Sequence, residues 1–206
     1  MEDLAADWYK VLGYPPVVLH EPPENWQGTV VYLGREGPWL KDLVKEPWAG
    51  KESFVLRADK DAAGRPSLVA TGSDLRGAIY AAYALSEELL GVDPWYFWTD
   101  HEPAFKGTVE VPDDLSLRFG PPTFEYRGWF INDEDLLSMF SPDPMRENVI
   151  SPAMHDRIFE TLLRLRGNMV VPATFAFPDE HSYLLAAKRG LVLRSTTFIF
   201  PPWRQL

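Results

Sequence analysis

The chain has 206 residues, 46% of them hydrophobic and 14% aromatic, which is enough for one large domain or two smaller ones with a buried core. A formal net charge of −10 argues against binding to nucleic acid or to an anionic membrane surface. The absence of cysteine excludes disulfide bonds, thiolate zinc sites and a cysteine nucleophile. Residues 1–120 carry 20 acidic and 11 basic side chains, whereas residues 121–206 carry 10 and 9, so the second half is the better place for an anionic ligand.

The amino terminus shows no targeting signal. The segment MEDLAADWYK is acidic and has neither the basic region nor the apolar core of a signal peptide. No apolar run elsewhere approaches the length of a transmembrane helix. We therefore expect neither a signal peptide nor a membrane-spanning segment in this sequence, and its compartment stays open.

Residues 1–120 are expected to form a small α/β domain of three or four strands and two helices. The chain opens in a helix that Gly13 ends, with apolar residues at helical spacing: Leu4, Trp8, Val11 and Leu12. Three apolar stretches rich in β-branched or aromatic residues predict strands, at 29–34, 53–58 and 67–72. A further short strand is predicted at 107–111, and a linker at 113–122.

The second helix of this domain is predicted to begin after Ser73 or Asp74, because either side chain can cap a helix amino terminus. Gly91 is expected to end it. Its apolar stripe is predicted to consist of Leu75, Ile79, Ala82, Leu85 and Leu89.

Residues 121–206 read as strand, helix, strand, helix, strand. The strands are predicted at 124–131, at 168–173 and from 191 to 193. Ser151 caps the first helix with Pro152 at its first position, and Asp179 caps the second. Their buried residues are predicted to be Ile158, Phe159, Leu162 and Leu165, and Leu184, Leu185 and Ala187, with Gly167 and Gly190 closing the two helices. This order predicts parallel strands with right-handed crossovers, which form only the opening part of an eight-stranded barrel.

Polar residues cluster where the strand at 124–131 ends. Asn132, Asp133 and Glu134 follow it directly, and chemistry in parallel α/β folds lies at the carboxyl ends of strands. Adjacent carboxylates repel one another, so at least one is expected to shift in pKa or to find a hydrogen-bond donor. A helix cap or a solvated turn is the alternative explanation.

The loop that follows the second helix contains PWYFW (94–98), four aromatic residues and a proline. Aromatic rings stack on the apolar faces of sugars, and neighbouring carboxylates accept hydrogen bonds from sugar hydroxyls. The alternative is that these rings fill a seam between two domains.

Other motifs carry little chemistry. His101 and Glu102 lack the spacing of a metal site, so no metal and no cofactor is predicted. His155 and His181 lie near helix starts and are interpreted as capping or surface residues. The segment GSDLRG (72–77) resembles a phosphate-binding turn but matches neither of the glycine-rich nucleotide-binding patterns, and no GxSxG motif is present.

Four segments, in this order and at this spacing, resemble glycoside hydrolase family 115, the xylan α-1,2-glucuronidases. They are GSDLRGAIYAAYALSEELLGVDPWYFWTD (72–100), YRGWFINDE (126–134), LLRLRGNMVVPA (162–173) and RGLVL (189–193). The family has an N-terminal α/β domain followed by a (β/α)8 barrel, so the resemblance implies this domain in 1–120 and the start of the barrel in 121–206. Family 67 α-glucuronidases and hexosaminidases share a small domain before a barrel and are the near alternatives.

The resemblance implies an inverting glycosidase that removes glucuronic acid or its 4-O-methyl ether from xylan. Such an enzyme needs a general acid and a general base roughly 6.5–9.5 Å apart. The family takes both from later barrel strands, so catalytic residues here are unknown and this chain alone is expected to be inactive. By the resemblance, Asn132, Asp133 and Glu134 bind sugar hydroxyls, and Trp95 and Trp98 form part of the pocket wall.

The resemblance also implies a chain shortened at both ends. The first strand of the N-terminal domain is missing, and the tail RSTTFIFPPWRQL (194–206) stands where the family usually has a histidine pair. Arg127, inside the strand, is interpreted as part of a structural ion pair rather than as a uronate ligand. The family is commonly secreted, and a homodimeric parent enzyme is expected.

Two other functions stay open on the sequence alone. The chain could be a carbohydrate-binding module without catalysis, using the aromatic loop and the acidic strand end. It could also be an interaction domain whose aromatic residues form a protein interface. For an incomplete barrel we expect exposed apolar strand edges, and with them poor solubility or a molten state.

Overall fold

The structure is a computed structural model, and it describes residues 1–21, 24–35, 40, 43–44, 47–132, 136–137, 150–172 and 181–194. The chain divides into two compact units, residues 1–123 and residues 124–206. The predicted boundary, between 120 and 121, lies close to this division. Among the described residues, no helix has both the length and the apolar character needed to cross a membrane.

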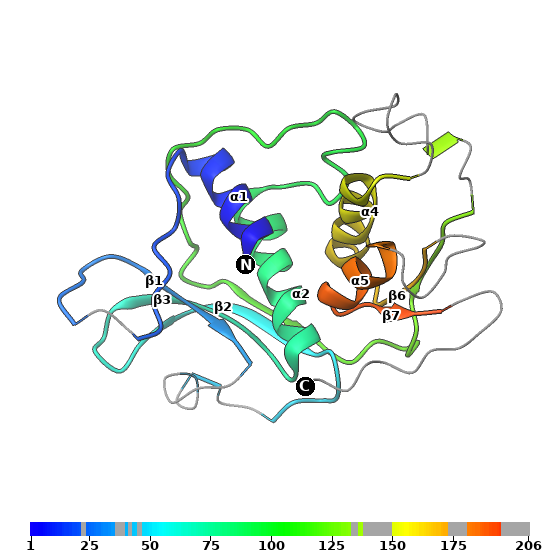
Figure 1. The fold of residues 1–206 in the computed structure, drawn as a ribbon. Helices are drawn as coiled ribbons and strands as arrows, with labels where there is room; N and C mark the ends of the chain where they lie inside the picture. The colour runs from blue at the N-terminus through cyan, green and yellow to red at the C-terminus, as the bar shows by residue number, and fades with distance from the viewer. Residues whose placement is uncertain are drawn as a thin grey trace. The chain divides into compact units, whose positions relative to one another are not determined.

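The first unit contains a four-stranded mixed sheet whose strands follow the spatial order β1-β3-β2-β4 (Figure 1). The strands are β1 (Val30–Gly34), β2 (Phe54–Lys60), β3 (Pro66–Gly72) and β4 (Ser116–Phe119). β1 runs parallel to β3, whereas β2 is antiparallel to both β3 and β4. The three strands predicted at 29–34, 53–58 and 67–72 are therefore confirmed.

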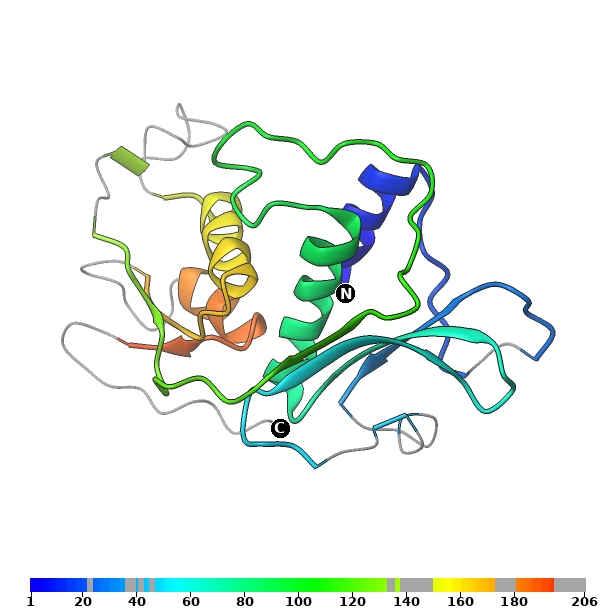
Figure 2. The ribbon, with the colours of Figure 1, turned by 180° about the vertical axis from the view of Figure 1, so that it is seen from behind.

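The fourth strand lies where the sequence predicted a linker. β4 pairs antiparallel with β2, and its green trace runs beside the cyan strand when the chain is seen from behind (Figure 2). The segment 107–111, predicted as a strand, forms none. Phe119 stacks on Phe54 with ring centroids 4.4 Å apart, so β4 is fixed by packing against its neighbour rather than by a strongly apolar sequence.

The helices of this unit are α1 (Glu2–Leu12), α2 (Leu75–Leu85) and a π-helical turn, η1 (Ser86–Leu90), that continues α2. Gly13 and Gly91 end the two helical segments with positive φ angles of 83° and 75°, as predicted. Asp74 caps α2, because its carboxylate accepts a 2.8 Å hydrogen bond from the backbone N–H of Gly77.

The predicted apolar stripe of α2 is wrong for most of its members. Leu75 is exposed, and Ile79, Ala82 and Leu89 are only half-buried, whereas Leu85 is buried as expected. The buried side of α2 instead consists largely of small and aromatic residues: Ala78, Tyr80, Ala81, Tyr83 and Ala84. Small side chains let the helix approach the sheet closely, and this is not visible as a leucine pattern.

Two glycines permit that close approach. A Cβ atom at Gly72 would lie 2.1 Å from the backbone nitrogen of Ala78, and one at Gly77 would lie 2.4 Å from the carbonyl oxygen of Ser53. The glycines of GSDLRG thus serve helix–strand packing, which gives this motif a structural role that needs no phosphate.

The second unit contains a parallel three-stranded sheet in the order β5-β6-β7. Its elements along the chain are β5 (Gly128–Phe130), α4 (Pro152–Arg164), β6 (Met169–Val171), α5 (His181–Lys188) and β7 (Val192–Leu193). The predicted order and the parallel pairing are confirmed. This is the order in which a (β/α)8 barrel begins, so the predicted fold class holds for both units.

The first strand of this sheet is shorter than predicted. Only residues 128–130 are paired, whereas the sequence predicted 124–131. Phe124 and Tyr126 are exposed, and Phe130 is 47% exposed. The alternation of aromatic residues that suggested a longer strand therefore continues before the paired region starts.

The helices of this unit follow the predicted caps better than the predicted faces. Ser151 accepts a 3.1 Å hydrogen bond from Met154 N and caps α4. Ile158, Phe159 and Leu162 are buried as predicted, whereas Leu165 is exposed. At the end of α4, Arg166 rather than Gly167 takes the positive φ, at 62°.

In α5 the buried residues are Ser182, Tyr183 and Ala186, so the predicted inward face of Leu184, Leu185 and Ala187 is wrong. Leu184 is 63% exposed. Gly190 follows the helix with a positive φ of 72°, as predicted. The predicted cap, Asp179, lies outside the described residues.

Candidate functional site

The aromatic loop, residues 92–105, folds through its own backbone hydrogen bonds. Asp93 begins it: its carboxylate accepts from Trp95 N at 2.7 Å, and its carbonyl accepts from Tyr96 N at 3.0 Å. Two further turns follow, from Trp98 N to Trp95 O at 2.8 Å and from His101 N to Tyr96 O at 3.0 Å. Successive turns of this kind hold the aromatic residues in a defined arrangement.

Helix α1 supports this loop from the first unit. The Lys10 ammonium lies 4.6 Å from the centre of the Tyr96 ring and 2.6 Å from a carboxylate oxygen of Glu102. At the end of the loop, Lys106 N and Gly107 N both donate to the carbonyl of Val11, at 2.7 and 3.1 Å. The sequence analysis missed Lys10, because 92 residues separate it from Glu102 and no spacing pattern connects them.

The aromatic residues of the loop divide into anchors and exposed rings. Tyr96 is buried, whereas Trp95 is 43% exposed and Trp98 is half-buried. Phe97 packs edge to face on Trp98, with ring centroids 5.1 Å apart and an interplanar angle of 88°. Trp95 and Trp98 therefore retain accessible ring surface on a loop that Tyr96 fixes to the core.

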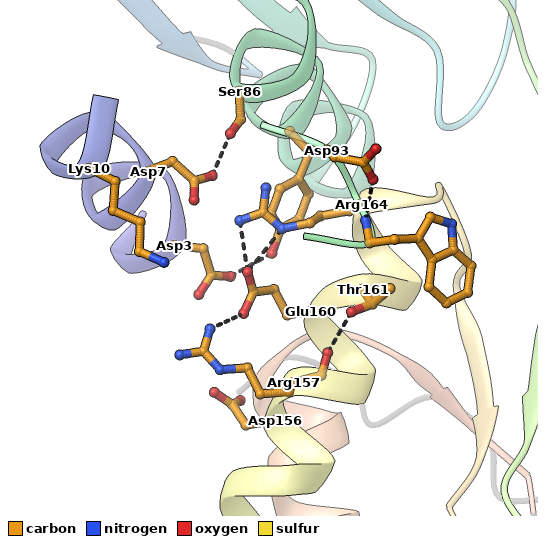
Figure 3. Close-up of polar contacts among 12 residues, drawn as sticks. Asp3, Asp7, Lys10, Ser86, Asp93, Asp156, Arg157, Glu160, Thr161 and Arg164 are labelled. Atoms are coloured by element: carbon orange, nitrogen blue, oxygen red, sulfur yellow. Dashed lines mark hydrogen bonds and ion pairs between the residues drawn. The ribbon is translucent and has the colours of Figure 1, made fainter. Parts of the chain in front are cut away.

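The helix that leads into the loop is held by hydroxyl–carboxylate pairs (Figure 3). Ser86, the first residue of η1, donates a short hydrogen bond to Asp7 of α1, and both residues are fully buried. One turn earlier, the Tyr83 hydroxyl donates to Asp3 at 2.5 Å. The two pairs connect α1 to the end of α2, so the loop starts from a fixed point.

The acidic strand end is described only in part. Ile131 N donates to the carbonyl of Val171 at 2.9 Å and continues the sheet past β5, and Asn132 follows as an exposed residue. Asp133 and Glu134 lie outside the described residues, and their predicted role stays a prediction.

The start of β5 is held by Arg127 and Asn168. Arg127 donates to the carbonyl of Arg166 from Nε at 3.0 Å and from Nη2 at 2.9 Å, and to the carbonyl of Phe124 at 2.8 Å. Asn168 accepts from Arg127 N at 2.8 Å and donates to the carbonyl of Glu125 at 2.6 Å. The structural interpretation of Arg127 agrees with these contacts, although they are made to backbone carbonyls rather than to a carboxylate.

Helix α4 contains a buried charged group that the sequence analysis missed (Figure 3). Glu160 accepts from Arg164 at 2.7 Å and from Arg157 at 2.8 Å. The side chains of Glu160 and Arg164 are 4% and 3% exposed. Their i, i+4 spacing is the available sequence signal, but it does not distinguish a buried pair from the usual solvated one.

The histidines behave differently from each other. His155 is buried and its Nε2 lies 3.2 Å from the carbonyl oxygen of Pro172, so the prediction of a capping or surface residue is wrong. His181 is exposed at the first position of α5. In the part of the chain that the structure describes, no three His, Asp or Glu side chains form a group that could hold a metal ion.

Two comparisons with known proteins point to one family. Residues 119–197 match the family model for glycosyl hydrolase family 115. The chain is also similar to a solved structure described as a novel family GH115 4-O-methyl-α-glucuronidase, BtGH115A, with specificity for decorated arabinogalactans. That similarity has 27% identity and a TM-score of 0.73, and it covers 93% of this chain. No curated protein matches the chain.

The resemblance to family 115 seen in the sequence is thereby confirmed, and with it the glycoside hydrolase-like origin of the chain. The chain spans 26% of the length of the matched structure, about a quarter. The family match covers the second unit, and the structural similarity extends over nearly all of both units.

Proposed function

We propose that this chain is a carbohydrate-recognising part of a family 115-like α-glucuronidase and that it does not hydrolyse glycosidic bonds by itself. The family match over residues 119–197 supports the hydrolase origin. Inactivity is proposed because the resemblance assigns the general acid and base to later barrel strands.

The observation that carries the recognition role is the exposed indole of Trp95 on a loop that Lys10 and Tyr96 fix in place. A rigid aromatic ring binds an apolar sugar face with little loss of side-chain entropy. The carboxylate of Glu102, held at 2.6 Å from the Lys10 ammonium, stands beside the same loop. This combination favours a neutral sugar ring over the free acid as the group bound at the loop.

The proposed ligand is a polysaccharide that carries glucuronic acid or 4-O-methylglucuronic acid. Glucuronoxylan is the first candidate because the family acts on it, and decorated arabinogalactan is the second because the matched structure is described as specific for it. Trp95 and Trp98 are proposed to contact the sugar chain, and Asn132, Asp133 and Glu134 to bind hydroxyls near the uronic acid.

Titration followed by chemical-shift change tests this proposal. We expect glucuronoxylan or arabinogalactan oligosaccharides to bind with millimolar or tighter affinity, and Trp95→Ala to weaken binding about tenfold, which corresponds to about 1.4 kcal/mol. Trp98→Ala is expected to weaken binding less. Trp26→Ala is the matched control, since Trp26 is 53% exposed outside the loop. Binding that is unchanged in Trp95→Ala, or absent at millimolar sugar, would reject the role of the loop.

Hydrolysis is tested separately with the same oligosaccharides. We expect no release of uronic acid above the blank. Release of the uronic acid that persists in an independently purified preparation would show that this chain holds a complete catalytic pair, and the inactive part of the proposal would fall.

A protein-binding role is the second candidate, and one observation favours it. Phe124 and Tyr126 are 73% and 54% exposed, and they precede β5, where Phe130 is 47% exposed. Exposed aromatic residues in sequence are typical of interfaces. Sedimentation of the chain over a range of concentrations tests a second copy as the partner, as a homodimeric parent would require. A monomer at all concentrations argues against it.

A further inference from the structure

The sheet of the first unit has a second face, opposite the one on which α2 packs. Phe54 contacts Tyr80 of α2, with ring centroids 6.4 Å apart, so Val55 and Arg57 point to the other side because side chains alternate along a strand. Thr71 and Arg118 stand directly opposite Val55, one on each neighbouring strand. Three polar side chains from β2, β3 and β4 therefore share this face.

A small cavity lies between these polar side chains. Arg57, Thr71 and Arg118 line it together with apolar residues that include Val55 and Val69, and it has room for about one water-sized particle. On the far side of Thr71, the residue in register on β1 is Gly34, which has no side chain. The absence of a side chain there leaves space beside the Thr71 hydroxyl.

Two polar atoms of this group are buried without a partner. Thr71 is 1% exposed, and its hydroxyl makes no hydrogen bond. The Nε atom of Arg57 is also buried and without a partner, although Nη2 of the same side chain donates to the carbonyl of Leu43 and, at 2.8 Å, to Asp59. Buried polar groups are nearly always hydrogen-bonded, so two such atoms on the second face call for a missing acceptor.

The chemistry of the lining selects the kind of acceptor. Both guanidinium groups can only donate, and the threonine hydroxyl can donate as well. None of the residues that line the cavity is acidic. The apolar walls lower the local dielectric constant, which strengthens the attraction of the arginines for a negative charge.

We propose that this cavity binds a single monatomic anion, of which chloride is the natural candidate. The anion accepts hydrogen bonds from the Thr71 hydroxyl and from Nε of Arg57, and the Arg118 guanidinium adds positive charge. The size of the cavity excludes acetate and larger carboxylates. This site is independent of the aromatic loop and of the proposed carbohydrate function.

Chlorine-35 NMR tests the site directly, because chloride in exchange with a protein site has a broadened line. We expect excess broadening with the whole chain, displaced by bromide but not by acetate or gluconate at equal ionic strength. With a Kd of about 10 mM, 100 mM chloride would also raise Tm by about 3–5 °C relative to gluconate.

Two variants and one control make the test specific. Thr71→Val keeps the shape of the side chain and is expected to remove most of the excess broadening, and Arg118→Gln is expected to reduce it at least fivefold. Arg76→Gln removes the same charge from an arginine that pairs with Glu52 at 3.1 Å and does not line the cavity, so it should keep the broadening. Far-UV circular dichroism confirms that each variant is folded.

Each alternative result overturns the proposal. If chloride is not broadened by the wild-type chain, the buried donors are satisfied by water alone. If acetate displaces chloride as well as bromide does, the site is an open carboxylate site rather than a closed cavity. If Thr71→Val and Arg118→Gln both keep the broadening, chloride binds elsewhere on the chain.

Discussion

In the first unit, the residues proposed to contact sugar lie in a loop that makes its own hydrogen bonds. In the second unit, Asn132 follows a strand of only three residues. Asp93 and Tyr96 supply the turns and the buried anchor of the loop, whereas β5 depends on Arg127 and Asn168, which bind carbonyl groups of neighbouring segments.

The difference shows that two kinds of support are used. The loop is defined by local turns and by one neighbouring helix, α1, so it needs nothing beyond the first unit. The end of β5 is defined by the parallel strand beside it, because Ile131 reaches only as far as the carbonyl of Val171. A site at the carboxyl end of a parallel sheet is therefore only as well formed as the strands that flank it.

The largest expected effects come from glycines in close contact with backbone, and they test whether the units are independent. A Cβ atom at Gly72 would lie 2.1 Å from Ala78 N in the first unit, and one at Gly128 would lie 1.8 Å from Met169 O in the second. We expect Gly72→Ala and Gly128→Ala each to cost about 3 kcal/mol or more. Hydrogen exchange should show the loss in the substituted unit only.

Gly120→Ala is the control for both changes, since a Cβ atom at Gly120 meets nothing within 4 Å. Its stability should stay within about 0.5 kcal/mol of the wild type. Loss of protection in both units after either substitution would show that they unfold together, and the comparison between a self-supporting loop and a dependent strand end would fail.

The next effect concerns the charged group of α4. Arg164→Met leaves the buried carboxylate of Glu160 with Arg157 as its remaining arginine partner, so we expect a loss of about 3 kcal/mol. Replacing Glu160 and Arg164 together by leucine should cost less than the single change, because no unpaired buried charge remains. Urea unfolding followed by hydrogen exchange in α4 measures both.

Arg189→Met is the matched control in the same unit. Arg189 pairs with Asp156 at 2.5 Å, but the side chain of Asp156 is 41% exposed, so about 1 kcal/mol or less is expected. A double variant that is less stable than Arg164→Met would mean that the pair itself, and not the stranded charge, stabilises α4.

A smaller effect depends on pH and concerns Asp61 in the first unit. Burial by itself would raise the pKa of this carboxyl, but hydrogen bonds from Arg65, Tyr32 and the Ala63 backbone outweigh it, and the net pKa lies below the ordinary 3.8. A pKa that is lower in the folded state contributes stability above about pH 4, which is lost as the pH falls through the folded value. Asp61→Asn should therefore cost about 1–2 kcal/mol at pH 7.

The difference between wild type and Asp61→Asn should shrink as the pH is lowered from about 5 to about 2, as measured by urea unfolding at each pH. Asp113→Asn, an exposed position, is the control and should show no such change. A difference that stays constant over this range would mean that packing, rather than the charge of Asp61, stabilises the turn.

The smallest effect tests the support of the aromatic loop. The side chains of Lys10 and Glu102 are 36% and 66% exposed, so Lys10→Met should cost only about 0.5 kcal/mol. The loop should nevertheless open more often, which faster exchange of the His101 amide would report. Lys51→Met, at another exposed lysine, should leave that exchange rate unchanged. Equal rates in Lys10→Met and wild type would show that Tyr96 alone fixes the loop.

Much of the fold was predictable because its signals are local. Asp74, Ser151, Gly13 and Gly91 mark helix ends through side-chain and backbone chemistry that acts within a few residues. The strands of the first sheet, β1 to β3, carry apolar β-branched residues throughout. The parallel order of the second unit followed from the alternation of strands and helices.

The failures arise where a distant partner decides the structure. β4 forms because Phe119 stacks on Phe54, whereas the more strand-like segment at 107–111 has no such partner strand. The inward side of α2 is set by close approach to Gly72, which favours alanine over leucine. For the same reason Trp95 could be proposed from the sequence, but Lys10, which supports its loop from far along the chain, could not.

The π-helical turn η1 has a consequence for how this loop can vary among related chains. A π turn holds one more residue than the α-helical turn it replaces. Removal of a single residue between Ser86 and Leu90 would restore the α-helical pitch and rotate everything that follows by about 100° around the helix axis. Insertions and deletions of one residue at this position, rather than exchanges of the aromatic residues themselves, would thus redirect the loop toward a differently shaped sugar.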